Sequence, residues 1–114
     1  MTVSTYIIKK NLAGKKVEVT VGDQMTPAEA ERFAKEFLAT TTSIDASQFQ
    51  LVIDGTNMKV LTPEMATKLE AAMGLYNQAG FSKVLTKLQN NPVLKMQVSR
   101  IARKAGLLNL EIIQ

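Results

Sequence analysis

The chain has 114 residues, a formal charge of +4 and a pI near 9.5, and 46% of its residues are hydrophobic. That length and composition are typical of one globular domain, residues 1–114, with its own core. Cysteine, histidine and tryptophan are absent, which excludes disulfides and thiolate catalysis and removes the commonest general base, metal ligand and stacking residue. We therefore expect a binding protein with no cofactor and no metal site, and not an enzyme.

No stretch of the sequence approaches the roughly 18 apolar residues that a membrane-spanning helix needs. Residues 1–12 include lysines and no long apolar run, so we expect no signal peptide. We expect a cytoplasmic protein that does not bind membranes. The mildly basic charge permits an acidic partner without requiring a nucleic acid.

The chain opens with a predicted β-hairpin. Residues 3–9 form the first strand candidate, and residues 17–21 alternate valine with polar residues, as a half-buried strand does. The connection over residues 11–16 contains Gly14, which is able to adopt a positive φ.

A helix is predicted to begin at Thr26 and Pro27, because threonine is a good N-cap and proline fits the first helical position. Glu29 completes a capping box. Apolar residues then recur at the spacing of one helical face, which we expect to pack on the sheet. That face consists of Ala30, Phe33, Ala34, Phe37 and Leu38.

Residues 49–53 form a nearly continuous apolar and β-branched run, typical of a central parallel strand covered on both faces. The turn-forming residues 54–57 follow. A second helix is predicted over residues 62–79, opened by a threonine and a proline and stopped by Gly80. Its inner stripe comprises Met65, Leu69, Ala72, Met73 and Tyr76.

The last third of the chain predicts a strand at residues 81–88, a helix over 91–106 with an Asn-Pro start and a glycine stop, and a final strand at 108–113. The complete order is β-β-α-β-α-β-α-β. It predicts an α/β domain with a mostly parallel sheet of four or five strands and helices packed on it.

Asp54, Thr56 and Asn57 follow the predicted central strand, at the end of an α/β sheet where ligands bind. A carboxylate there can hold a metal or a phosphorylated partner, but turns select the same residues, and we favour the turn. Thr62 is either a phosphoacceptor or a plain N-cap before a proline, and we favour the cap. Glu64 complements the helix dipole.

Basic residues on the third predicted helix and near the hairpin form a second candidate surface. They are Lys95, Arg100, Arg103 and Lys104 on the helix, Lys83 and Lys87 before it, and Lys9, Lys10, Lys15 and Lys16 at the hairpin. Such residues contact phosphates, but no nucleic-acid motif accompanies them, so we favour a solvated face. The alternative function is nucleic-acid association through helix 91–106 and the N-terminal hairpin.

Three segments match one family pattern: FQLVIDGTN at residues 49–57, FSKVLTKL at 81–88, and NPVLKMQVSRIARKAGL at 91–107. They correspond to a buried strand, the following strand, and the last long helix with its Ala-Gly-Leu exit. Together with the order of elements, they resemble the STAS domain family, named for sulphate transporters and anti-sigma factor antagonists, over nearly the whole chain. The resemblance implies a STAS-like single domain that is non-enzymatic and regulates another protein by binding it.

In the anti-sigma factor antagonists of that family, an Asp-Ser-[Ser/Thr]-Gly-like motif before the second helix is phosphorylated to release the partner. The matching residues here, LTPEM at 61–65, contain no serine and no glycine. Thr62 aligns with the aspartate of the motif, and Glu64 falls near the acceptor as a fixed negative charge. We therefore predict a regulatory protein partner, kinase-like or from a sigma-factor pathway, without the usual phosphorylation switch. Its predicted binding residues are Asp54, Thr56, Asn57, Thr62 and Glu64.

Overall fold

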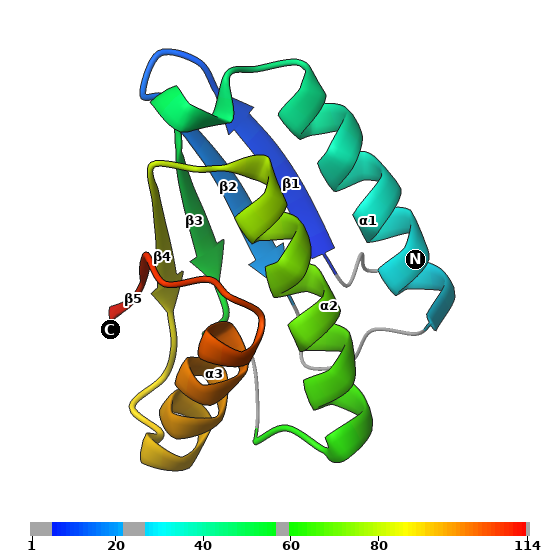
Figure 1. Cartoon of the computed structure of the whole chain (residues 1–114), viewed down its shortest axis with the longest axis vertical. Helices are drawn as coiled ribbons and strands as arrows, with labels where there is room; N and C mark the ends of the chain where they lie inside the picture. Colours follow the sequence, from blue (N-terminus) through cyan, green and yellow to red (C-terminus); the bar gives the residue numbers. More distant parts are fainter. Residues whose placement is uncertain (1–5, 22–26, 57–59, 114) are drawn as a thin grey trace.

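The computed structural model describes residues 6–21, 27–56 and 60–113. Within these ranges the elements follow the predicted order β-β-α-β-α-β-α-β and form one five-stranded mixed sheet, with helices packed on it (Figure 1). A 3-10 turn, η1 (Ala46–Gln48), precedes the third strand. The predicted fold class is thereby confirmed.

The hairpin consists of β1 (Tyr6–Asn11) and β2 (Lys16–Val21), paired antiparallel. The positive φ in its turn belongs to Lys15, at 51°, so Gly14 does not use the positive φ that a glycine can adopt. Gly14 instead allows a close approach: its N–H donates to Asn11 Oδ1 at 2.9 Å, and an added Cβ would lie 3.0 Å from Asn11 Nδ2. A side chain at residue 14 would therefore push against the group that closes the turn.

The remaining strands are parallel to β2 and follow it across the sheet in chain order. They are β3 (Gln50–Asp54), β4 (Lys83–Lys87) and β5 (Leu110–Ile113), which give the order β1-β2-β3-β4-β5. Each crossover from β2 onward moves to the next strand in the same direction. Right-handed crossovers that all advance the same way place every connecting helix on the same face of the sheet.

The three helices, α1 (Pro27–Thr42), α2 (Pro63–Ala79) and α3 (Pro92–Lys104), accordingly form one layer over one face (Figure 1). The strand β3 was expected to be covered on both faces, and this is wrong. Leu51 is 0% exposed and Ile53 5%, but Val52, on the opposite face, is only partly buried. The described residues therefore form two layers, and none of their helices lies on the outer face of the sheet.

The core lies between the sheet and the helix layer. An aromatic group joins α1 to α2: the rings of Phe37 and Tyr76 are 5.0 Å apart, and those of Phe33 and Phe37 are 5.8 Å apart. Leu38, predicted to share the inward stripe, is 45% exposed, because that end of the stripe rotates beyond the edge of the core. No helix in the described ranges is long and apolar enough to cross a membrane.

Two of the three predicted helix starts can be checked. Thr62 caps α2 through a bond from Met65 N–H, and Asn91 caps α3 through a bond from Leu94 N–H. At the end of α2, Gly80 adopts a φ of 79°, as predicted for a glycine stop. The third start, Thr26, lies outside the described residues.

Candidate functional site

The carboxyl ends of β2, β3, β4 and β5 meet at one edge of the sheet, because these strands are parallel. Here β3 leads toward α2 and β4 leads to α3. Ligands of open α/β sheets bind at this edge. Four of the five predicted site residues belong to it, and the fifth, Asn57, lies outside the described residues.

Asp54 ends β3 and closes the turn that follows. Its Oδ1 accepts hydrogen bonds from the Thr56 hydroxyl at 2.7 Å and from the Thr56 N–H at 3.1 Å. The Gly55 N–H donates to the Lys87 carbonyl at 2.8 Å, which ties the turn to β4. The hydrogen bonds from Thr56, aided by the Lys87 charge, hold the pKa of the Asp54 carboxyl below its usual value. This is the geometry of the turn that we favoured.

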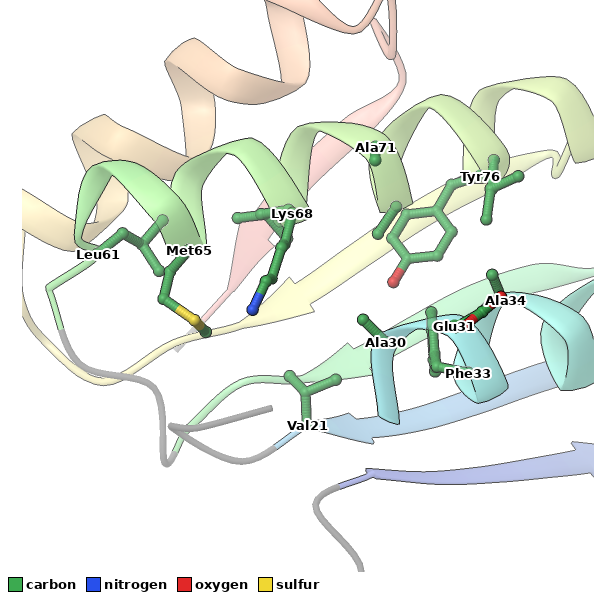
Figure 2. A pocket seen from close by; sticks show the side chains of 13 residues that line it. Val21, Ala30, Glu31, Phe33, Ala34, Leu61, Met65, Lys68, Ala71 and Tyr76 are labelled. Atoms are coloured by element: carbon green, nitrogen blue, oxygen red, sulfur yellow. The ribbon is translucent and has the colours of Figure 1, made fainter. Parts of the chain in front are cut away.

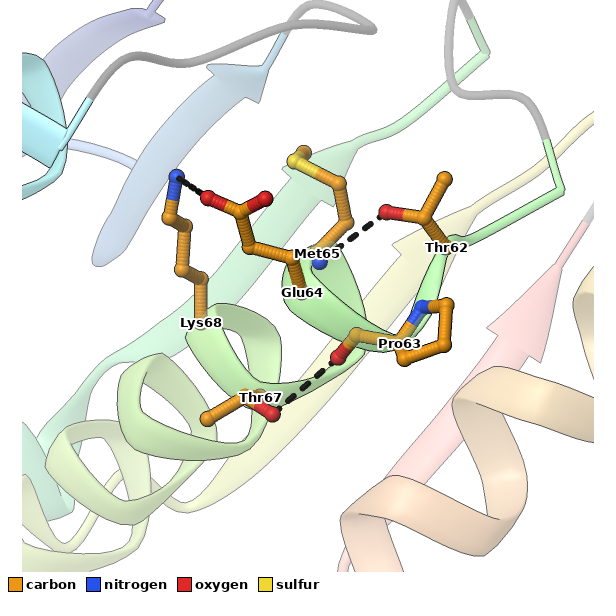
Figure 3. Close-up of polar contacts among 6 residues, drawn as sticks. All are labelled: Thr62, Pro63, Glu64, Met65, Thr67 and Lys68. Atoms are coloured by element: carbon orange, nitrogen blue, oxygen red, sulfur yellow. Dashed lines mark hydrogen bonds and ion pairs between the residues drawn. The ribbon is translucent and has the colours of Figure 1, made fainter.

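Thr62 and Glu64 lie in the first turn of α2 (Figure 3). The Thr62 hydroxyl accepts the Met65 N–H at 3.2 Å and so serves as the N-cap. Glu64 extends from the helix, and its carboxylate lies 3.6 Å from the Lys68 ammonium. Both predicted residues are thus exposed, while Thr62 already has a structural role.

The segment before α2 is fixed to α3 by Gln97, a residue that the sequence analysis did not single out. The Leu61 N–H donates to Gln97 Oε1 at 2.9 Å, and Gln97 Nε2 donates to the Leu61 carbonyl at 3.1 Å. One amide side chain therefore satisfies both polar groups of one peptide residue. This pair of hydrogen bonds holds the start of α2 against α3, although Leu61 and Gln97 are 36 residues apart in the sequence.

Three exposed apolar side chains lie near this contact along the chain. Val60 is 49% exposed, Val93 is 53% exposed and Met96 is 60% exposed. Val60 adjoins Leu61, while Val93 and Met96 lie within one helical turn of Gln97 on α3. We call the exposed residues Val60, Thr62, Glu64, Val93 and Met96 the α2-start surface.

The basic residues are spread over the molecule and partly paired. Lys83 lies 2.8 Å from Glu111, and Lys104 lies 3.3 Å from Glu70. The hairpin lysines lie on β1, on β2 and, for Lys15, in the turn between them. The hairpin is at the opposite edge of the sheet from β5, over which α3 lies. The two basic groups proposed for nucleic-acid contact therefore do not form one continuous surface.

A groove between α1 and α2 is a further feature that the sequence analysis missed (Figure 2). It encloses about 300 Å³, and its walls are mainly alanine, leucine and methionine side chains of the two helices. The alanines that line it fit the amphipathic pattern of their own helices, so the sequence contains no sign of a groove. The space arises only when α1 and α2 pack side by side.

Comparison with known protein families found no match for this chain, and comparison with curated proteins found no relative. Within the described residues, no three acidic side chains come together in a way that would hold a metal ion. The site is therefore characterised by its geometry alone: a fixed turn, a capped helix start and an exposed apolar group beside them.

Proposed function

We propose that this protein is a non-enzymatic regulatory domain that binds another protein through the α2-start surface. The partner we propose is a regulatory protein of the kinase-like or sigma-factor-pathway type, as the resemblance to STAS domains implies. The observation that carries the proposal is the group of Val60, Val93 and Met96, which are about half exposed or more at the edge where α2 and α3 begin.

Exposed apolar groups of this kind, with polar residues at their rim, favour contact with another protein. Methionine adapts its shape to a partner, and Thr62 and Glu64 add a polar and an acidic contact beside it. The Gln97 bonds keep the loop and α3 in fixed relation, so little ordering is required when a partner binds.

We propose that binding here is not controlled by phosphorylation in the usual way. The Thr62 hydroxyl is engaged in capping α2, and Pro63 follows it directly. Glu64 supplies a permanent negative charge in the first turn, where the helix dipole favours one. A surface with a fixed charge would bind its partner constitutively.

Catalysis has less support in this region, because its acidic groups are already engaged. Asp54 accepts two hydrogen bonds from Thr56, and Glu64 pairs with Lys68. Nucleic-acid association also has less support, since Lys83 and Lys104 form ion pairs and the hairpin lies apart from α3. This nucleic-acid alternative would be supported by DNA or RNA binding that weakens steeply as the salt concentration rises.

The proposal is tested by placing a photo-crosslinking amino acid at Met96 in the native cell. Leu108 is the matched position, because it is 82% exposed but lies beyond the other end of α3. We expect a defined protein to crosslink at position 96 and not at position 108, and excess wild-type domain to compete with it. Crosslinking that is the same at both positions, or only to nucleic acid, would refute the proposal.

A further inference from the structure

The groove between α1 and α2 has the volume and lining of a small-molecule site. Its volume of about 300 Å³ is at the lower end of the range for ligand pockets. An apolar cavity of about 150 Å³ is large enough for benzene, so this groove accommodates roughly a two-ring molecule. Ala30 and Ala34 form one wall, and Met65, Leu69 and Ala72 contribute to the other.

Tyr76 gives the groove a polar group at its inner side. The residue is 2% exposed, and its ring packs against Phe37 and Phe33. Figure 2 shows the hydroxyl directed from α2 toward α1, into the space that the alanines border. Burial raises the pKa of this hydroxyl above its usual value, which keeps it neutral and able to donate or accept.

The Tyr76 hydroxyl opens onto the groove, whereas Thr86 Oγ1 is the fully buried side-chain oxygen without a partner among the described residues. A phenylalanine at position 76 would fill the same space in the core, so packing alone does not require the hydroxyl. A hydroxyl that opens onto an apolar groove is a hydrogen-bonding group placed where a ligand can reach it. A ligand in the groove that carries one polar group can form a hydrogen bond with this hydroxyl.

The charges at the rim indicate that the ligand is neutral. Lys68 and Glu31 both border the groove, and the Lys68 ammonium also lies 3.6 Å from the Glu64 carboxylate. A cationic and an anionic side chain at the same opening offset each other. Neither an anionic nor a cationic ligand would therefore gain much from the rim.

We propose that the groove binds a neutral two-ring apolar molecule whose single hydroxyl, carbonyl or N–H group forms a hydrogen bond with Tyr76. The ring system occupies the space between the alanines of α1 and the apolar residues of α2. This ligand site is independent of the proposed docking function, because Tyr76 and Ala34 are not part of the α2-start surface.

The test uses 2-naphthol as probe and naphthalene as its counterpart without a hydroxyl. Both fluoresce, and the protein contains no tryptophan that would interfere, so fluorescence titration measures their affinities. We expect wild type to bind both probes. We expect Tyr76→Phe to bind naphthalene as before and 2-naphthol about fivefold more weakly, since one neutral hydrogen bond is lost.

Two alanine variants provide the steric test. Ala34→Leu fills the groove and should abolish binding of both probes, whereas Ala39→Leu makes the same change at an exposed position of α1 and should bind normally. Ala71→Leu, on the opposite wall, replaces Ala34→Leu if that variant unfolds. Failure of wild type to bind either probe would overturn the proposal. So would normal binding by the filled variant, or equal effects of Tyr76→Phe on both probes.

Discussion

At the scale of single residues, two side chains reveal what the fold requires of its polar groups. Thr86 lies on the helix-covered face of β4, at 3% exposure, and its hydroxyl has no hydrogen-bond partner in the described part of the chain. Asp54, on the outer face, has its carboxylate engaged by Thr56. The Thr86 hydroxyl should lower the free energy of unfolding, and the Asp54 carboxylate should raise it.

Replacing Thr86 with valine should stabilise the domain, because valine keeps the shape and removes a buried hydroxyl with no partner. The free energy of unfolding should rise by about 1 kcal/mol. Urea denaturation measures it, with Thr20→Val on the partly exposed outer face of β2 as the control that should change little. A loss of stability in Thr86→Val would mean that this hydroxyl has a partner in solution.

Asp54 should make stability depend on pH in the acid range. Its pKa is lowered in the folded protein, so its contribution is fully present above the ordinary value near 4 and is lost as pH falls through the folded pKa. Asp54→Asn keeps an oxygen acceptor but has no such titration. Urea unfolding at pH 6 and at pH 3 should show the wild-type advantage over Asp54→Asn shrinking in acid. An advantage that is constant or grows in acid would contradict this account.

At the scale of elements, α2 offers a matched pair of glycines. Gly80 ends the helix with a φ of 79°, a conformation that costs alanine about 1 kcal/mol. Gly74 lies inside the same helix, and a Cβ there would meet nothing within 4 Å, so alanine should add about 0.5–1 kcal/mol. Gly80→Ala should therefore lower, and Gly74→Ala raise, the midpoint of urea unfolding. Shifts of the same sign would show that the cap geometry is not what ends α2.

The elements also show which features local sequence rules can predict. Thr62, Asn91 and Gly80 were predictable because caps and stops depend on neighbouring residues only. The two-bond contact of Gln97 with Leu61 was not, since it joins segments 36 residues apart. Likewise, the apolar run at residues 49–53 does not reveal that only one face of β3 is covered by described helices. That coverage depends on the direction of all the crossovers, which is a property of the whole sheet.

At the scale of the whole molecule, the one-sided helix layer decides where function can reside. It leaves the starts of α2 and α3 side by side at the carboxyl edge, where the Gln97 contact joins them (Figure 1). The α2-start surface includes Thr62 and Glu64, which were predicted as binding residues, and Val60, Val93 and Met96, which were not among the predicted binding residues. Isolated valines and a methionine give no clear signal in sequence, because only the assembled fold shows that each of them is exposed.

The most direct test of the docking proposal is the affinity of the partner captured at position 96 for two glutamate variants. Met96→Glu places a charge within the α2-start surface, and Leu108→Glu places the same charge at an 82% exposed position away from it. We predict that Met96→Glu weakens binding about tenfold or more, the effect expected for a central interface residue. We predict that Leu108→Glu leaves the dissociation constant unchanged. Equal affinities for the two variants would contradict the assignment of this surface.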